Sequence, residues 1–195
     1  MRTNLKPVRK IGPGQNSLRG QIQSKKNETS HDFESALERD YLLLLEFDVN
    51  VARYVEQPVE IVYEYEGKTR SYTPDVLVYY RDDLTPAKLY PPMLIEIKYR
   101  KKLKDNWKEL KPKFKAAIDY ADSQGWKFKI LTEVEIRNTY LENIKFLLPY
   151  KDSQYVDSND SALLMESIRN LDLTTPEEII VASARDKYKI GRAHV

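Results

Sequence analysis

The chain has 195 residues and a mass of 22.9 kDa. Of its residues 41% are hydrophobic and 32% are charged, values that are ordinary for a globular protein of one or two domains. No apolar run approaches the roughly 20 residues of a bilayer span, and the N-terminus lacks an apolar signal core. We therefore expect no membrane association and a cytoplasmic location.

The sequence contains no cysteine and two histidines. This composition excludes disulfide scaffolds, thiolate zinc sites and cysteine nucleophiles, and it leaves little room for histidine-based metal sites or triads. Any chemistry is therefore expected to depend on carboxylates and lysines.

The net charge of +2 is unevenly distributed along the chain. Residues 1–31 contain seven Lys and Arg against one Glu, and residues 98–115 contain nine basic residues against two acidic ones. The remaining residues then carry a net charge of −11. This asymmetry indicates a basic surface that faces a polyanion and acidic clusters elsewhere, some of which could bind metal. Charge alone equally allows a solvated tail and a solvated helix face.

The first half of the chain is expected to contain an arm, a helix and three strands. Residues 1–29 are basic, rich in Gly, Asn, Gln and Ser, and lack periodicity, which is typical of a flexible arm. Apolar residues at spacings of three and four then predict a helix over 30–46, capped by Thr29 or Ser30. A stretch rich in β-branched residues and tyrosine, interrupted by proline and a turn, predicts strands at 51–57, 59–66 and 69–80.

The second half of the predicted core alternates strands and helices. We expect a strand at 93–98, a lysine-rich amphipathic helix at 104–123, a strand at 126–132 and a helix at 133–148. Together these elements predict an α/β fold with a mixed central sheet flanked by helices.

The region 150–195 begins with a polar linker and continues with two predicted helices. Residues 161–171 have a helical pattern, and Thr175 followed by Pro176 is a strong helix start. Two such helices could begin a small winged-helix domain. The sequence stops too early to complete that module, so we expect the natural C-terminus to lie beyond Val195.

One constellation of residues can carry chemistry. Asp75 follows Pro74 near the start of a strand, and after 20 intervening residues Glu96 and Lys98 lie two apart on the next strand. Alternate side chains of a strand share a face, so Glu96 and Lys98 point together, away from Ile97. Two carboxylates and the carbonyl of Ile97 offer the oxygen ligands that Mg²⁺ prefers, and Lys98 can orient or deprotonate water and balance charge on a phosphorus-centred transition state.

The alternative explanation of this pattern is the solvated face of a surface strand, since Pro-Asp and Glu-x-Lys are each common by chance. Two features of the context favour a site: Glu96 and Lys98 end a strand that is otherwise apolar, and the basic segment starts directly after them. A third carboxylate is expected from the first helix. Glu34 and Glu38 would lie one turn apart on it, and their positions alone do not separate them.

The residues also resemble a known family. The segments SALERDYLLLLEFDVNVARYVEQPVEI, TPDVLVYY, LIEIKYR and KFKILTE are similar to the N-terminal nuclease domain of the TnsA family, the endonuclease partner in heteromeric transposases that also use TnsB and TnsC proteins. The resemblance covers about 30–149. It implies a restriction-endonuclease-like fold that cleaves the non-transferred strand at the 5′ transposon ends, while the TnsB partner cuts and joins the other strand.

The family's site residues transfer to this sequence by position. The resemblance implies Glu38 as the helix glutamate, Asp75 as the metal-binding aspartate and Lys98 as the catalytic lysine. Some relatives have glutamine where this chain has Glu96. We expect Glu38, Asp75, Glu96 and the carbonyl of Ile97 to hold two Mg²⁺ ions, with Mn²⁺ as an alternative metal.

The cations that follow the Glu-x-Lys strand are expected to bind DNA phosphates, because they stand where a substrate would approach the metals. These are Arg100, Lys101, Lys102 and Lys104. Two other functions remain open from the sequence. One is a free-standing phage or repair nuclease of the same fold, and the other is a catalytically silent DNA-binding scaffold subunit.

Overall fold

The computed structural model describes residues 20–27, 29–83 and 90–148, with the single positions Ala162, Glu166, Arg169 and Thr175. The chain divides into two compact units after Leu148, and the first unit contains every described strand. Residues 1–19 of the expected arm lie outside the described residues, and so does almost all of the expected winged-helix segment. Among the described helices, none has both the length and the hydrophobicity that crossing a membrane requires.

A four-stranded mixed sheet forms the centre of the first unit. Its strands are ordered β3 (Val51–Glu56), β6 (Val76–Tyr80), β7 (Met93–Ile97) and β8 (Lys127–Leu131). The β3–β6 and β6–β7 pairs are antiparallel, and β7 and β8 are parallel. A parallel pair needs a crossover connection, which α2 (Arg100–Asp105) and α3 (Trp107–Ser123) provide. The predicted fold class, a mixed sheet flanked by helices, is confirmed.

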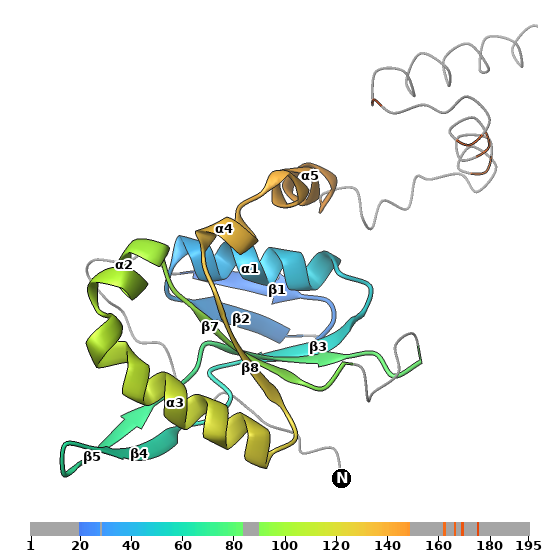
Figure 1. Ribbon diagram of the computed structural model, residues 1–195. Coiled ribbons are helices and arrows are strands. Elements are labelled where there is room, and N and C mark those ends of the chain that lie inside the picture. Colours follow the sequence, from blue (N-terminus) through green and yellow to red (C-terminus); the bar gives the residue numbers. More distant parts are fainter. Residues whose placement is uncertain are drawn as a thin grey trace, which may run out of the picture. The chain divides into compact units, whose positions relative to one another are not determined.

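Helices cover both faces of this sheet (Figure 1). The helix α1 (Ala36–Phe47) packs on one face in a core that includes Ile95 and Ile97, and α3 packs on the other in a core that includes Leu94. The alternation predicted for β7 is therefore confirmed. Because side chains of a strand alternate between faces, Glu96 and Lys98 belong to the α3 side.

A separate hairpin adjoins α3. It consists of β4 (Ile61–Tyr65) and β5 (Lys68–Tyr72), paired with each other and with no other described strand. Its turn places Glu66 and Gly67 at φ of 53° and 69°, the left-handed pair that a tight two-residue hairpin requires. The strand predicted at 69–80 is thus two strands, since the chain leaves the hairpin after Tyr72 and begins β6 at Val76. Pro74, which has no N–H to donate to a ladder, lies in the break.

The expectation of a flexible arm through residue 29 was wrong for its last part. Strand β1 (Gly20–Ser24) pairs antiparallel with β2 (Thr29–Phe33), so the helix predicted over 30–46 cannot begin there. Both strands are polar, and the hydrophobic alternation that reveals most strands is missing from them. Phe33 of β2 and Ile22 of β1 pack in the core of α1, and buried polar contacts add to this: His31 bonds to Glu56 of β3, and Ser24 donates to Glu46 of α1 at 2.5 Å.

Helix α1 starts at Ala36 because Ser35 caps it. The Ser35 hydroxyl accepts from the Glu38 amide at 3.2 Å and donates to the Glu38 carboxylate at 2.8 Å. A Ser followed three residues later by Glu is a strong helix-start signal, and it outweighs the predicted caps Thr29 and Ser30, which lie in β2.

Two other helices differ from the predictions. The cationic segment ahead of residue 104 is helical and forms α2, although Leu103 is its single apolar residue. The helix predicted over 133–148 is divided into α4 (Glu133–Ile136) and α5 (Thr139–Leu147). Asn138 interrupts it, because its side chain accepts from the Leu141 amide at 3.1 Å and so caps a new helix.

A buried carboxylate ties these last helices to α1. Asp40 is 1% exposed and accepts from Arg137 Nε at 2.8 Å and from Arg39 at 3.0 Å, with Lys145 Nζ at 3.6 Å. Desolvation raises the pKa of Asp40, but the hydrogen bonds from Arg137 and Arg39 and the charge of Lys145 outweigh it, so the pKa lies below its ordinary value.

Candidate active site

Asp75 is the residue directly before β6. Backbone hydrogen bonds fix it to the two segments that flank this strand. Its amide donates to the Ile95 carbonyl at 3.1 Å, and its carbonyl accepts from the Gln57 amide at 2.8 Å. One carboxylate oxygen, Oδ2, accepts from the Ile97 amide at 2.6 Å. The break at Pro74 therefore turns the aspartate side chain toward β7, which carries the other half of the Asp and Glu-x-Lys pattern.

Glu96 is buried, with 1% exposure, and both of its carboxylate oxygens have partners. Oε1 lies 3.1 Å from Lys98 Nζ and 3.2 Å from Lys113 Nζ. Oε2 accepts from the Tyr72 hydroxyl at 2.6 Å. A buried carboxylate needs such partners to offset its lost hydration, so Glu96 and Lys98 form a fixed ion pair and are not the solvated face of a surface strand.

Glu38 reaches the same region from α1. Its carboxylate accepts from the Glu34 amide at 2.8 Å as well as from Ser35. Glu34 itself precedes the helix, so the two glutamates do not lie one turn apart on one helix face as the sequence suggested. Glu38 lines a small pocket with Asp75, and Glu34 does not.

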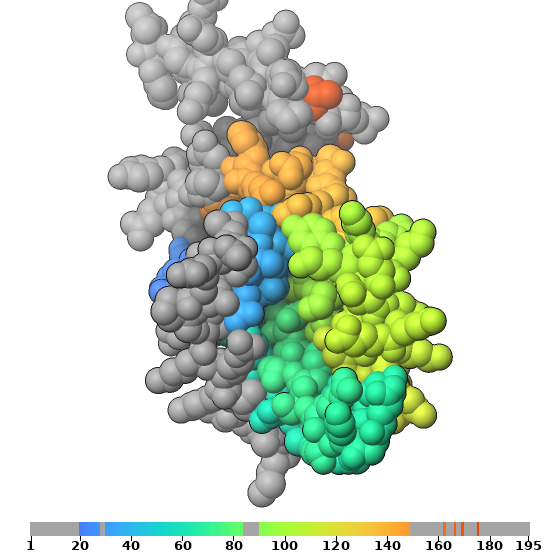
Figure 2. All heavy atoms as spheres, turned by 90° about the vertical axis from the view of Figure 1, so that its left-hand side faces the viewer, coloured from blue at the N-terminus to red at the C-terminus, as the bar shows by residue number. Residues whose placement is uncertain are grey.

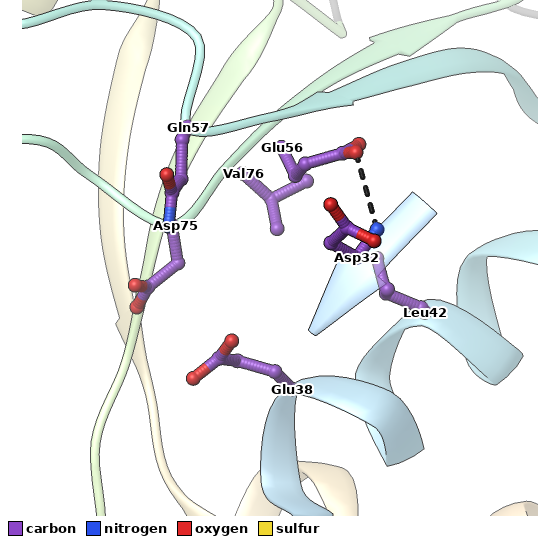
Figure 3. A pocket seen from close by; sticks show the side chains of 7 residues that line it. All are labelled: Asp32, Glu38, Leu42, Glu56, Gln57, Asp75 and Val76. Carbon is purple, nitrogen blue, oxygen red and sulfur yellow. Dashed lines mark hydrogen bonds between the residues drawn. The ribbon is translucent and has the colours of Figure 1, made fainter. Parts of the chain in front are cut away.

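Figure 3 shows this pocket, in which the carboxylate of Glu38 points from α1 toward that of Asp75. Asp32, Glu56 and Gln57 also line it. Asp75 and Glu38 thus lie close enough for their negative charges to repel each other.

The pKa values of the site groups reflect this crowding. Burial, together with the charges of Glu96 and Glu38, raises the pKa of Asp75 well above its ordinary value. Burial likewise raises the pKa of Glu38. Desolvation lowers the pKa of Lys98, but the carboxylates of Glu96 and Asp75 outweigh this and raise it on balance. The three carboxylates and Lys98 are thus one electrostatic unit.

The donor chemistry of this unit suits a hard divalent cation. In the described part of the chain no three His, Asp or Glu side chains form a group that could hold a metal ion as they lie. However, Glu38 and Asp75 present oxygen donors to a shared pocket. The pKa of Asp75 is raised by burial and then by the charges of Glu96 and Glu38, a repulsion that a cation would relieve. A carboxylate has about four lone-pair sites, so Glu96, with three contacts, retains room for one more bond.

Sequence reasoning missed three residues of the site. Lys113 of α3 and Tyr72 of β5 bind Glu96 from elements distant in the sequence, and no local pattern indicates such contacts. Gln57 has φ of 44°, is 9% exposed, and its side-chain Oε1 has no hydrogen-bond partner among the described residues. The signal in the sequence that could have identified Gln57 was its place between Glu56 and Pro58, at the end of a strand.

The four cations predicted to bind DNA lie together on α2, and all are exposed. The Arg100 amide donates to Glu133 Oε2 at 2.8 Å, so this carboxylate satisfies an amide at the start of α2. Figure 2 looks onto the face where α1 and the α2–α3 segment flank a hollow of the surface. Helix α2, which carries these cations, belongs to one flank of that hollow (Figure 2).

Comparison with known proteins gives a match to a family model. Residues 48–133 match the family model described as TnsA-like endonuclease N terminal. No curated protein matches the chain. The matched segment contains Asp75, Glu96, Lys98 and Lys113 and begins after Glu38, so Glu38 is connected with the site by its position in the pocket.

Proposed function

Because residues 48–133 belong to the TnsA-like endonuclease family, we propose that this protein is a Mg²⁺-dependent DNA endonuclease of a heteromeric transposase, which cleaves the non-transferred strand at the 5′ transposon ends. One observation carries the proposal: Asp75 Oδ2 lies 2.6 Å from the Ile97 amide, Lys98 Nζ lies 3.1 Å from Glu96 Oε1, and Glu38 of α1 lines a pocket with Asp75. The fold thus brings together acidic and basic groups that are spread over 60 positions of the chain.

The proposed metal ligands are Glu38, Asp75, Glu96 and the carbonyl of Ile97, and Mn²⁺ could replace Mg²⁺. When bound, the metal would supply Lewis-acid activation of the phosphodiester and of the attacking water. The hydrogen bond from the Ile97 amide to Asp75 Oδ2, at 2.6 Å, keeps this carboxylate beside β7. The number of ions, expected to be two, belongs to the same proposal.

Lys98 would act on the phosphate and on water. Its ammonium group lies 3.1 Å from Glu96 Oε1 and within electrostatic range of Asp75 and Glu38. From that position it can donate to the attacking water and balance the negative charge that builds up on the nonbridging oxygens. The side chain is 32% exposed, so it remains accessible from solvent.

The DNA would approach along α2. Arg100, Lys101, Lys102 and Lys104 follow the catalytic strand directly and are solvent-exposed. Such cations bind phosphates without reading the base sequence, so we propose that TnsB-like and TnsC-like partners supply the choice of transposon ends and of target.

The decisive experiment is strand cleavage in a reconstituted transposition mixture that contains transposon-end DNA, the partner proteins and Mg²⁺. Asp75→Ala and Lys98→Ala are each expected to reduce cleavage at the 5′ ends at least about 100-fold, the effect of removing a group that stabilises transition-state charge. Chelation of the divalent ion should abolish cleavage by the unmodified protein.

Lys129→Ala is the control for these variants, because Lys129 is an exposed lysine of β8. It should cleave normally. All three variants should unfold cooperatively, as the unmodified protein does. Normal cleavage by both Asp75→Ala and Lys98→Ala would overturn the assignment of the site, and cleavage that persists after chelation would overturn its metal dependence.

A further inference from the structure

Lys113 is set apart from the other lysines of α3 by its surroundings. Its ammonium group lies 3.2 Å from Glu96 Oε1 and 4.4 Å from the centroid of the Tyr72 ring. Its side chain is 18% exposed, whereas the neighbouring Lys111 and Lys115 are exposed to solvent. A mostly buried lysine with a carboxylate and an aromatic face as partners is fixed in position.

Tyr72 and Lys113 support each other as well as Glu96. The Tyr72 hydroxyl donates to Glu96 Oε2 at 2.6 Å, while the Tyr72 ring packs against Phe114, the residue after Lys113, with centroids 6.3 Å apart. The hairpin and α3 therefore meet at Glu96. Two of the three partners of this carboxylate come from outside the Asp and Glu-x-Lys pattern.

The contacts have a consequence for Lys98, because Lys98 and Lys113 share the same oxygen of Glu96. A carboxylate held on both oxygens cannot rotate to follow a single lysine, so the position of Lys98 depends on the other two partners. We propose that Lys113 is a positioning residue of the active site, which together with Tyr72 fixes the carboxylate of Glu96 and through it holds the ammonium group of Lys98.

Direct binding of DNA by Lys113 is the competing explanation. It fits the observations less well, since the ammonium group is turned to a buried carboxylate and little of the side chain is exposed. Lys111 and Lys115 carry the same charge on the same helix but are exposed and have no contact with Glu96 among the described interactions. They also provide matched controls.

The first test rests on the proposed function and uses the same reconstituted cleavage mixture. Lys113→Met should lower kcat about 10- to 100-fold, the usual effect of removing a partner that orients a site residue, and should leave the KM for transposon-end DNA unchanged. Lys113→Arg should restore part of kcat because guanidinium can pair with carboxylate and stack on tyrosine. Lys115→Met should have normal kcat. A raised KM with normal kcat, or an equal loss for Lys115→Met, would overturn the inference in favour of DNA binding.

The second test needs no cleavage and so separates this inference from the proposed function. The full chain is treated briefly with an amine-acylating reagent, and the modification of each lysine is followed by mass spectrometry. Lys113 should react severalfold more slowly than Lys111 and Lys115, and Glu96→Gln should remove that protection, because the neutral amide no longer holds the ammonium group. Tyr72→Phe, which loses the hydroxyl alone, should accelerate acylation of Lys98.

The two tests give distinct outcomes. A protected Lys113 whose protection depends on Glu96, in a protein that cleaves no DNA, would support the positioning contacts and overturn the nuclease proposal. Equal acylation of Lys113, Lys111 and Lys115 in the unmodified chain would overturn the inference, whatever the chain cleaves.

Discussion

Gln57 combines two unfavourable features next to the carboxylates of the site. Its φ of 44° is in the left-handed region, which costs a residue with a Cβ about 1–2 kcal/mol. Its buried Oε1 has no hydrogen-bond partner among the described residues, and an unsatisfied buried polar atom costs about 1–3 kcal/mol. Residues with such unfavourable features are found mostly at functional sites. We therefore interpret Gln57 as a residue that contacts the substrate.

Gln57→Gly is therefore expected to stabilise the protein and to impair cleavage. Glycine increases the entropy of the unfolded chain and thereby lowers the free energy of unfolding by roughly 0.4–1 kcal/mol. Removal of the left-handed strain and of the unsatisfied amide should exceed this loss, for a net gain of about 1 kcal/mol in the free energy of unfolding. Urea denaturation measures the stability, and the reconstituted mixture measures cleavage.

Gln57→Asn is the matched control, since asparagine keeps the amide and tolerates left-handed backbone. It should retain more cleavage activity than Gln57→Gly. A Gln57→Gly protein that is less stable than the unmodified chain, or that cleaves normally, would contradict this account.

Individual residues differ in how well the sequence predicts them. Asp75, Glu96 and Lys98 could be selected because their spacing on adjacent strands is itself the signal. Lys113 and Tyr72 could not, because their contacts with Glu96 depend on how α3 and the hairpin pack. The choice of Glu38 over Glu34 needed the family resemblance, and the structure adds that Ser35, not Thr29 or Ser30, begins the helix.

Helix α2 offers a test of the proposed DNA path. Replacement of its four cations, Arg100, Lys101, Lys102 and Lys104, by glutamine should weaken DNA binding and flatten its salt dependence. Each cation that contacts a phosphate contributes about 0.9 to the slope of log K against log salt, so loss of all four should reduce the slope by up to about 4. Binding isotherms at several salt concentrations measure the slope.

The control for α2 replaces Lys68 of the hairpin and Lys129 of β8, which are exposed and lie on other elements. The slope should change little for this variant. If the slope changed equally per removed charge in the two variants, the cations would act only through the net charge of the protein. This result would contradict the proposal that DNA binds along α2.

Elements with strong periodicity were predicted well, and those that depend on tertiary contacts were not. The strands β3, β7 and β8 and the helix α3 were expected close to their observed ranges because their apolar spacing is regular. The β1–β2 pair was missed, since much of what holds it is tertiary, such as the contacts of His31 with Glu56 and of Ser24 with Glu46. A period-two pattern of polar residues does not distinguish such strands from a flexible arm.

Asp40 joins parts of the chain that are nearly 100 residues apart, since Arg137 binds it from a sequence separation of 97. Asp40→Asn should destabilise the protein by about 1.5–3 kcal/mol at neutral pH, the contribution of hydrogen bonds to a charged group. Because Arg137 and Lys145 are more than a third exposed, water can rehydrate them, and the loss should not exceed this range.

The same carboxylate predicts a dependence of stability on pH. The pKa of Asp40 is lower in the folded chain than its ordinary value of 3.8, so at acidic pH the unfolded chain binds more protons at this position. Its contribution is complete above the unfolded pKa and is lost as the pH falls below 3.8 toward the folded pKa. Between neutral pH and pH 3, unfolding of Asp40→Asn should therefore depend less on pH than that of the unmodified chain.

Asp122→Asn is the control, because Asp122 pairs with Lys127 in an exposed bridge. Such bridges contribute about 0–1 kcal/mol, so the variant should unfold as the unmodified protein does at both pH values. Equal pH dependence of Asp40→Asn and the unmodified chain would show that other carboxylates dominate the acid response.

The order of the strands also bears on how the protein folds. The site draws on α1, the break before β6, the end of β7, and α3, and it is complete only when β7 has paired in parallel with β8 across the crossover. Parallel pairing between distant segments closes large loops and is slow compared with hairpin or helix formation. A chain that is newly synthesised or partly unfolded should therefore lack the proposed nuclease activity until the last contacts form.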